Sequence, residues 1–177
     1  MKNDIKKVLV SEKQIDEITS ALANQLNKDY ANKEVLVIGM LKGGIPFMMD
    51  LIKKIEIQIE IDFMQTSSYH GGTESDSLVF KKDIDTNIEN KHVLIVDDIV
   101  DTGKTLTLII DMLSKRNAAS IEIVTLLDKP EGRTVVLEPK YIGTTIPKEF
   151  VVGYGLDYDE KYRNLPYIGV LKEEIYK

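Results

Sequence analysis

Three aspartates and a short polar turn stand together in the middle of the chain. Asp97 and Asp98 directly follow the apolar run 93–96, and Asp101 comes three residues later. The residues after them are Thr102, Gly103, Lys104 and Thr105. Consecutive backbone N–H groups in a glycine-containing turn before a helix can bind a phosphate, whereas carboxylates suit sugar hydroxyls or a hard cation such as Mg²⁺. The cluster therefore predicts a site for a sugar phosphate.

Simpler interpretations of the same residues exist. Asp98 or Asp101 could cap the following helix, and Thr102 or Thr105 could satisfy its first N–H groups. Against this, three carboxylates after a buried strand cost more free energy than one helix cap requires. A nucleoside-triphosphate loop would share the Gly-Lys-Thr ending of the cluster, but it needs a glycine where this chain has Asp98. The dinucleotide pattern Gly-x-Gly-x-x-Gly does not occur in the sequence.

The residues around the cluster predict an α/β fold. The apolar run 93–96 is typical of a parallel strand buried on both faces, and the apolar spacing of residues 106–113 predicts an amphipathic helix after the turn. Residues 34–40 and 121–127 predict further strands. With 177 residues, 43% of them hydrophobic, we expect one domain, residues 1–177, whose mainly parallel twisted sheet is flanked by helices.

Charged residues also follow the two neighbouring strands. Lys42 and Gly43 follow the first of them, before a helix that begins near Pro46, where a cation would suit pyrophosphate. Lys129 and then Arg133 follow the other strand. Because the carboxyl ends of parallel strands share one edge of a sheet, these residues should lie near the aspartates. Taken alone, the glycine could merely form a turn, and each cation could be a solvated loop residue.

Hydrophobic periodicity assigns most of the remaining chain. A capping box at Ser11 predicts an amphipathic helix near the N-terminus, and residues 57–63 alternate like a strand at or near a sheet edge, with Asp62 on its solvent face. Residues 66–77 are rich in Gly, Ser and Thr, which predicts a mobile loop, with a return strand after it. Residues 141–171 predict short strands.

The aspartate cluster and the strand before it resemble the diphosphate-sugar signature of the type I phosphoribosyltransferases. The form Asp-x-x-Asp-Thr-Gly-Lys-Thr is similar to that of the hypoxanthine-guanine branch. The similarity implies the α/β, single-domain type I phosphoribosyltransferase fold. It also implies a flexible lid loop at 66–77 with the pair Ser68 and Tyr69, and a small irregular hood formed by C-terminal strands, about 130–171.

The resemblance implies an enzyme of purine salvage. It would transfer the phosphoribosyl group of 5-phosphoribosyl 1-pyrophosphate, with Mg²⁺, to N9 of hypoxanthine or guanine, giving IMP or GMP and pyrophosphate. Asp101 would be the base at purine N7. Asp157 would bind Mg²⁺, and Asp97 and Asp98 would hold either the metal or the ribose hydroxyls. The substrate-binding positions implied are Lys42, Gly43, Ser68, Tyr69, Asp97, Asp98, Thr102, Gly103, Lys104, Thr105, Lys129, Phe150, Val151 and Arg163.

Several of these residues have a specific role in the family they resemble. Lys129 would donate to the purine 6-oxo group, Phe150 would stack on the base, and Val151 would offer backbone groups to it. Lys42 and Arg163 would bind pyrophosphate, and the peptide bond before Lys42 can be cis in the family.

Composition and charge limit the partners. The chain has 29 acidic and 23 basic residues, a net charge of -6, which opposes loose binding to nucleic acid or anionic lipid. It has no cysteine, and no segment approaches the roughly 20 apolar residues that span a membrane. We expect a cytoplasmic homodimer or homotetramer. Two alternatives stay open: an RNA-binding pyrimidine-operon regulator on the same fold, which should have a basic face, and a phosphoribosyltransferase that prefers xanthine.

Overall fold

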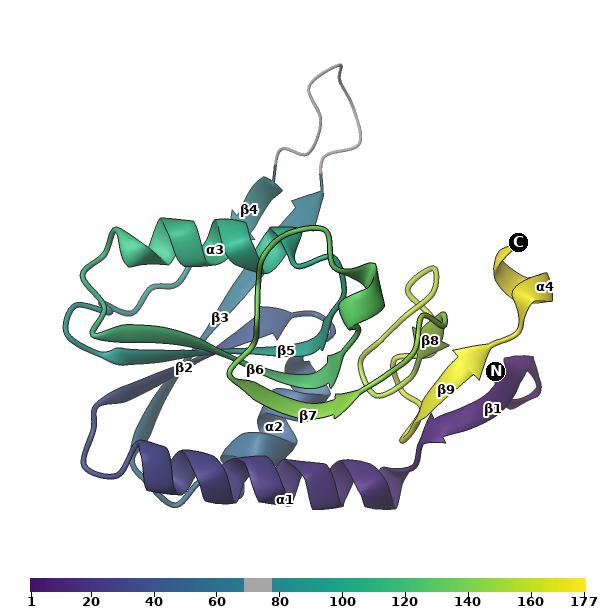
Figure 1. Cartoon of the computed structure of the whole chain (residues 1–177), viewed down its shortest axis with the longest axis horizontal. Coiled ribbons are helices and arrows are strands. Elements are labelled where there is room, and N and C mark those ends of the chain that lie inside the picture. Colours follow the sequence, from purple (N-terminus) through teal and green to yellow (C-terminus); the bar gives the residue numbers. More distant parts are fainter. Residues whose placement is uncertain (69–77) are drawn as a thin grey trace.

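A six-stranded sheet forms the centre of the molecule (Figure 1). The computed structural model describes residues 1–68 and 78–177, and the strand order of this main sheet is β4-β3-β2-β5-β6-β7. Neighbouring strands are parallel except for β3 and β4. The strands are β2 (Val35–Leu41), β3 (Ile59–Ser68), β4 (Leu78–Lys82), β5 (His92–Val100), β6 (Ser120–Asp128) and β7 (Tyr141–Thr145). The predicted mainly parallel sheet is confirmed.

Helices cover both faces of the main sheet. α1 (Glu12–Asp29) and α2 (Ile45–Ile52) pack on one face, and α3 (Lys104–Ser114) packs on the other (Figure 1). The predicted capping box is present at Ser11. The shorter helical segments are η1 (Lys2–Asp4), η2 (Pro130–Gly132) and α4 (Glu173–Tyr176). None of the described helices is long and apolar enough to cross a membrane.

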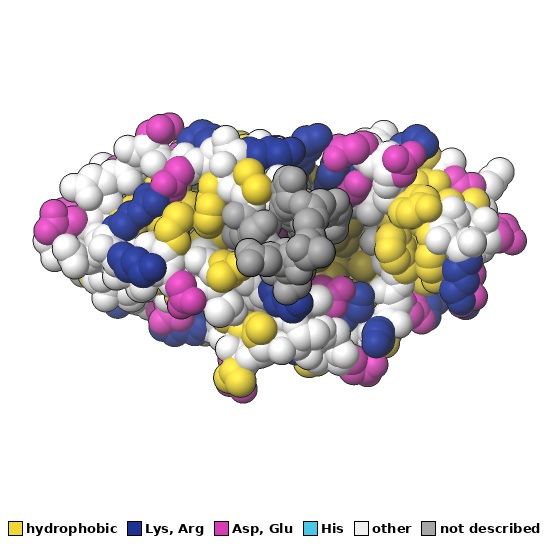
Figure 2. Space-filling model, turned by 90° about the horizontal axis from the view of Figure 1, so that it is seen from above, with side chains coloured by type: hydrophobic (Ala, Val, Ile, Leu, Met, Phe, Trp, Pro, Cys, Tyr) yellow, Lys and Arg dark blue, Asp and Glu magenta, His cyan; other side chains and the backbone are white. Residues whose placement is uncertain are grey.

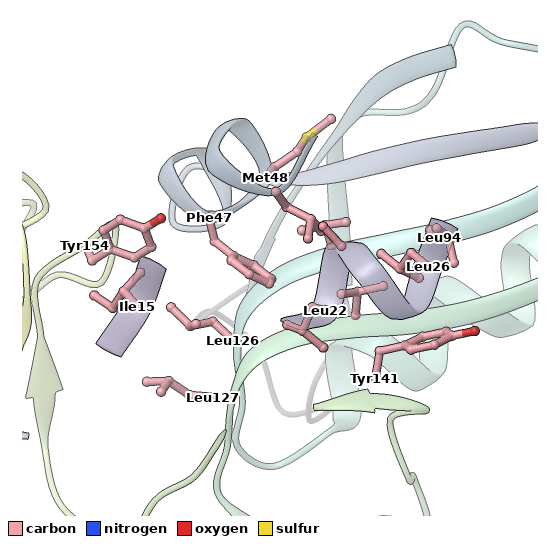
Figure 3. Packing of buried hydrophobic residues seen from close by; sticks show 14 of the residues in the cluster. Ile15, Leu22, Leu26, Phe47, Met48, Leu94, Leu126, Leu127, Tyr141 and Tyr154 are labelled. Atoms are coloured by element: carbon pink, nitrogen blue, oxygen red, sulfur yellow. The ribbon is translucent and has the colours of Figure 1, made fainter. Parts of the chain in front are cut away.

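Burial on both faces explains the unbroken apolar runs. In β2, Val35 and Val37 pack beneath α1 and α2, whereas Leu36 and Ile38 pack beneath α3. Each such side chain contributes about 1.5–3 kcal/mol when fully buried. Figure 3 shows the first of these two clusters, with Leu22, Leu26, Phe47, Met48, Leu126 and Tyr141 among its members. The strands are therefore held firmly, and the residues at their carboxyl ends have a rigid support.

A second sheet, the hood, lies beyond the carboxyl ends of β5 and β6 (Figure 1). Its strand order is β1-β9-β8, with β1 (Ile5–Val10), β8 (Val151–Val152) and β9 (Ile168–Leu171) all antiparallel. This differs from a hood of C-terminal strands alone, because β1 comes from the N-terminus and β7 joins the main sheet. β9 is the central strand of this sheet, so β8 pairs the backbone groups on one side of it and β1 pairs those on the other.

The first three residues of the predicted loop 66–77 belong to a strand instead. Residues 66–68 are the last part of β3 and pair with β4, so that Ser68 lies opposite Leu78 at the end of the ladder. The predicted return strand is confirmed as β4. Tyr69 and the rest of the predicted lid, 69–77, lie outside the described residues.

Asp62 is buried, and the prediction that it faces solvent is wrong. Its side chain is 8% exposed, and its carboxylate accepts hydrogen bonds from the backbone N–H groups of Phe63, Asp85 and Thr86. Burial opposes ionisation, but these hydrogen bonds outweigh it and lower the pKa of Asp62 to about 2. The strand alternation gave no sign of this, because the segment that covers Asp62 follows it by more than twenty residues.

Candidate active site

The aspartate cluster lies at the carboxyl end of β5, beside a cavity of about 260 Å³. The strand continues to Val100, so Asp97 and Asp98 lie within its last part and not after it. The cavity is lined by Asp97, Asp98, Ile99, Val100, Asp101, Thr102, Gly103, Thr105 and Leu106. The strand end, the turn and the start of α3 therefore face one space, as their sequence positions predict.

The start of α3 tests the interpretation of the aspartates as helix caps. Its N-cap is Gly103, whose φ of 81° lies in the left-handed region that favours glycine. Neither Asp98 nor Asp101 is the N-cap, so that interpretation is wrong for both. The hydroxyl of Thr102 does accept a 3.4 Å hydrogen bond from the N–H of Lys104. Thr105 follows in the first turn of the helix and lines the cavity.

Asp97 and Asp98 are adjacent carboxyl groups whose charges act on each other. Asp98 is 9% exposed, and its carboxylate occupies the space where a side chain at position 43 would lie. A Cβ built on Gly43 would come within 1.9 Å of Asp98 Oδ2, so this close approach requires glycine. Burial raises the pKa of both carboxyls, and the charge of Asp98 raises the pKa of Asp97 further. Both carboxyls are therefore harder to ionise than an exposed aspartate.

The turn after β2 brings Lys42 to the same edge of the sheet. The Leu41–Lys42 peptide bond is cis, and α2 begins at Ile45 with Pro46 in its first turn. Lys42 Nζ forms a 2.8 Å ion pair with Glu160 Oε2, although their side chains are 54% and 64% exposed. The hydrogen bond from Lys42 lowers the pKa of Glu160. The predicted pyrophosphate lysine therefore already holds an acidic partner.

Arg163 belongs to the same network of charges. Its Nη2 lies 2.8 Å from Asp157 Oδ1 and 3.4 Å from Glu160 Oε1, and its Nη1 donates to the carbonyl of Gly155 at 2.7 Å. The N–H of Glu160 donates to Asp157 Oδ2 at 2.9 Å. The structure thus brings Lys42, Arg163 and Asp157 together through Glu160. Sequence analysis missed Glu160, whose only signal is an acidic side chain between two candidate site residues.

Asp101 and Lys129 form a second lysine–carboxylate pair. Lys129 Nζ lies 2.9 Å from Asp101 Oδ2, and the two side chains are 13% and 43% exposed. The backbone N–H of Lys129 also donates to Val100 O at 3.0 Å, across the ends of β5 and β6. Two residues that the sequence separates by 28 positions are therefore held side by side.

Arg133 has a structural place beside this pair. Its guanidinium pairs with the carboxylate of Asp128 and donates to the carbonyl of Leu137, and its Nε donates to Asp101 O at 3.0 Å. The Arg133 and Asp128 side chains are 13% and 10% exposed. The interpretation of Arg133 as a solvated loop cation is wrong, because it fastens the segment after β6 to the Asp101 turn.

Phe150 and Val151 stand at the start of β8 in the hood. Phe150 is 38% exposed, while Val151 is buried and pairs with Val170 of β9. Figure 2 shows hydrophobic side chains gathered on the hood end of the molecule, and acidic and basic side chains intermixed nearer its centre. The hood thus offers an exposed aromatic ring that a ligand can contact.

A larger cavity, of about 500 Å³, lies elsewhere, between α1, α2 and Tyr154. Four of its charged lining residues are paired with one another, Lys54 with Asp16 and Lys53 with Asp50. It contains none of the residues that the sequence singles out, and we place the candidate site at the strand ends.

Comparison with known proteins assigns the family. Residues 8–159 match the phosphoribosyl transferase domain. Hypoxanthine-guanine phosphoribosyltransferases of Streptococcus pneumoniae and Streptococcus pyogenes are 59% and 55% identical, each alignment covering 99% of this chain and 98% of the relative. A solved hypoxanthine phosphoribosyltransferase from Staphylococcus aureus superposes with a TM-score of 0.96 at 55% identity, covering 100% of this chain and 97% of that one. This chain belongs to the phosphoribosyltransferase family, in its hypoxanthine-guanine branch.

Proposed function

We propose that this enzyme transfers the phosphoribosyl group of 5-phosphoribosyl 1-pyrophosphate to N9 of hypoxanthine or guanine, giving IMP or GMP and pyrophosphate. The observation that carries the proposal is the 2.9 Å pair of Lys129 and Asp101. The 6-oxo oxygen and N7 are neighbours on one edge of a 6-oxopurine. A lysine ammonium only donates hydrogen bonds, and a carboxylate can accept a proton. The pair therefore matches both atoms of that edge.

Asp101 acts as the base in this proposal. As pyrophosphate leaves, C1 of the ribose becomes cation-like, and the purine that attacks it must lose a ring proton. A carboxylate beside N7 can take that proton, and Lys129 at the 6-oxo group stabilises negative charge on the base. Phe150 stacks on the ring, and Val151 offers backbone groups to it. Ser68 and Tyr69 are proposed to close over the site with the lid.

The donor is held by the two turns. The N–H groups and hydroxyls of Thr102, Gly103, Lys104 and Thr105 bind the phosphate on the sugar. Asp97 and Asp98 hold the ribose hydroxyls or share in metal binding, since carboxylate oxygens can do either. Lys42, Gly43 and Arg163 bind the pyrophosphate, and the carboxylate of Glu160 gives up both cations when it arrives.

The residues present fit Mg²⁺ only together with the donor. Among the described residues, no three His, Cys, Asp or Glu side chains are grouped so that they could hold a metal ion. Mg²⁺ is commonly bound by one or two carboxylates together with substrate phosphates and water. Asp157, whose side chain is 30% exposed, would supply one such carboxylate. When bound, the metal would neutralise charge on the leaving pyrophosphate.

Steady-state kinetics with hypoxanthine, guanine, xanthine and adenine test the proposal. We expect turnover of hypoxanthine and guanine and no measurable turnover of adenine. Equal use of adenine would contradict the role of Lys129, and preferred use of xanthine would select the alternative specificity. Retention of RNA in a filter-binding assay at low salt would favour the regulator instead. A cytoplasmic location and a homodimeric or homotetrameric state belong to the same proposal.

A further inference from the structure

The C-terminal helix places an aromatic ring on Phe150. The rings of Tyr176 and Phe150 are stacked, with centroids 4.7 Å apart and planes inclined by 19°. Tyr158 meets the Phe150 ring edge-on, at 5.7 Å and 86°. Phe150 nevertheless keeps 38% of its surface exposed. One face of the ring is thus covered by the protein's own C-terminal segment, while other parts of it can contact a ligand.

Backbone hydrogen bonds fix this segment against the hood. The N–H of Leu171 donates to Phe150 O, and the N–H of Lys172 donates to Asp4 O, both at 2.9 Å. Tyr176 also packs against the hood's buried cluster. The Tyr176 ring is therefore held against Phe150 by the packing of the hood itself.

We propose that Tyr176 is a positioning residue for the purine: it holds the Phe150 ring in the orientation that stacks on the base. This inference rests on the proposed function, in which Phe150 contacts the purine. A phenylalanine side chain at the surface rotates about two torsions, and binding a base would remove that freedom. A stacked neighbour restricts the Phe150 side chain before the base binds, so binding costs less conformational entropy of that side chain. Aromatic pairs with this geometry also attract each other beyond their buried area.

The test is Tyr176→Leu, which keeps an apolar contact with the hood and removes the stacked ring. We expect the KM for hypoxanthine to rise about two- to tenfold. The kcat and the KM for 5-phosphoribosyl 1-pyrophosphate should stay at their original values. Tyr176→Phe keeps the ring and should restore the original KM. Tyr167→Leu, a change of the same kind in the same hood cluster, is the control and should leave the KM for hypoxanthine unaltered.

A double-mutant cycle with Phe150→Leu locates the effect. If Tyr176 acts through Phe150, Tyr176→Leu will add nothing to the KM of the Phe150→Leu enzyme. An unchanged KM in Tyr176→Leu overturns the inference. A lowered KM also overturns it, because Tyr176 would then cover the face that the base uses. Equal increases in the KM for hypoxanthine in Tyr176→Leu and Tyr176→Phe would assign the effect to the hydroxyl group and overturn the role of the stacked ring. Failure of the proposed function itself is separate, since the unaltered protein would then not turn over hypoxanthine.

Discussion

Two lysine–carboxylate pairs of nearly equal length occupy opposite halves of the candidate site. Lys42 and Glu160 are 2.8 Å apart with side chains 54% and 64% exposed, whereas Lys129 and Asp101 are 2.9 Å apart with side chains 13% and 43% exposed. Exposed ion pairs contribute little to stability and exchange partners readily. A mostly buried hydrogen-bond donor such as the Lys129 ammonium costs more free energy when it loses its partner. In the proposed function, the exposed pair would therefore be easily replaced when the phosphoribosyl donor binds, and the less exposed pair would already be in place for the base.

The two pairs also differ in what holds them together. Asp101 and Lys129 follow β5 and β6, which are neighbours in the main sheet and pair at their ends through Val100 and Asp128. Lys42 meets a residue 118 positions away, in the loop that joins β8 to β9 of the hood. The pairing of strands in the main sheet thus positions Asp101 and Lys129, whereas the packing of the hood against the main sheet positions Lys42 and Glu160. The four predictions below test this contrast, in order of decreasing effect.

Removal of the metal should have the largest effect. Without Mg²⁺, the donor half of the site has Lys42 and Arg163 to balance the charge of pyrophosphate, and both begin in ion pairs with carboxylates. We expect excess EDTA to abolish turnover and added Mg²⁺ to restore it. Activity that persists in EDTA would remove Asp157 from the proposed metal site. Thermal unfolding of the chelated protein is the control for loss of structure.

Asp101→Asn should lower kcat by roughly 10²–10⁴, because a positioned general base contributes about that factor. The KM for 5-phosphoribosyl 1-pyrophosphate should change much less, since the donor is bound by other residues. Steady-state kinetics with saturating hypoxanthine measure this split. A kcat equal to that of the unaltered enzyme would exclude Asp101 as the base and leave the sheltered pair without a catalytic role.

Lys129→Met should weaken discrimination between bases. In the proposed function, the ammonium donates to the 6-oxo group of hypoxanthine and guanine, whereas adenine has an amino donor at that position. We expect kcat/KM for hypoxanthine to fall at least roughly tenfold, with a smaller change for adenine. Competition between the two bases measures the ratio directly. If both values fell by the same factor, Lys129 would support Asp101 without choosing the base.

Glu160→Gln should have the smallest effect, and in the opposite direction. If Lys42 and Arg163 bind pyrophosphate as proposed, the carboxylate competes with it for both cations, and its removal should lower the KM for 5-phosphoribosyl 1-pyrophosphate by about two- to fivefold. Glu17→Gln in α1, another exposed acid with a lysine partner, makes the same change in net charge and is the control. A raised KM in Glu160→Gln would show that Glu160 assists donor binding instead of competing with it.

Sequence patterns determined much of the fold because they act locally. Runs buried on both faces marked β2, β5 and β6, and the capping box at Ser11 marked the start of α1. Polar residues at the ends of these strands then had to share one edge, because parallel strands end on the same side of a sheet. The aspartate cluster, Lys42 and Lys129 could therefore be assigned to one site before any contact between them was known.

The partners of those residues were decided only in the tertiary structure. That Lys42 meets Glu160, that Tyr176 lies on Phe150, and that β1 completes the hood all depend on how distant segments pack. The burial of Asp62 has the same origin, since a later segment covers a position that alternates like a solvent-facing one. Periodicity reports which face of an element is apolar, but it carries no information on which charge or ring from elsewhere in the chain will lie against it.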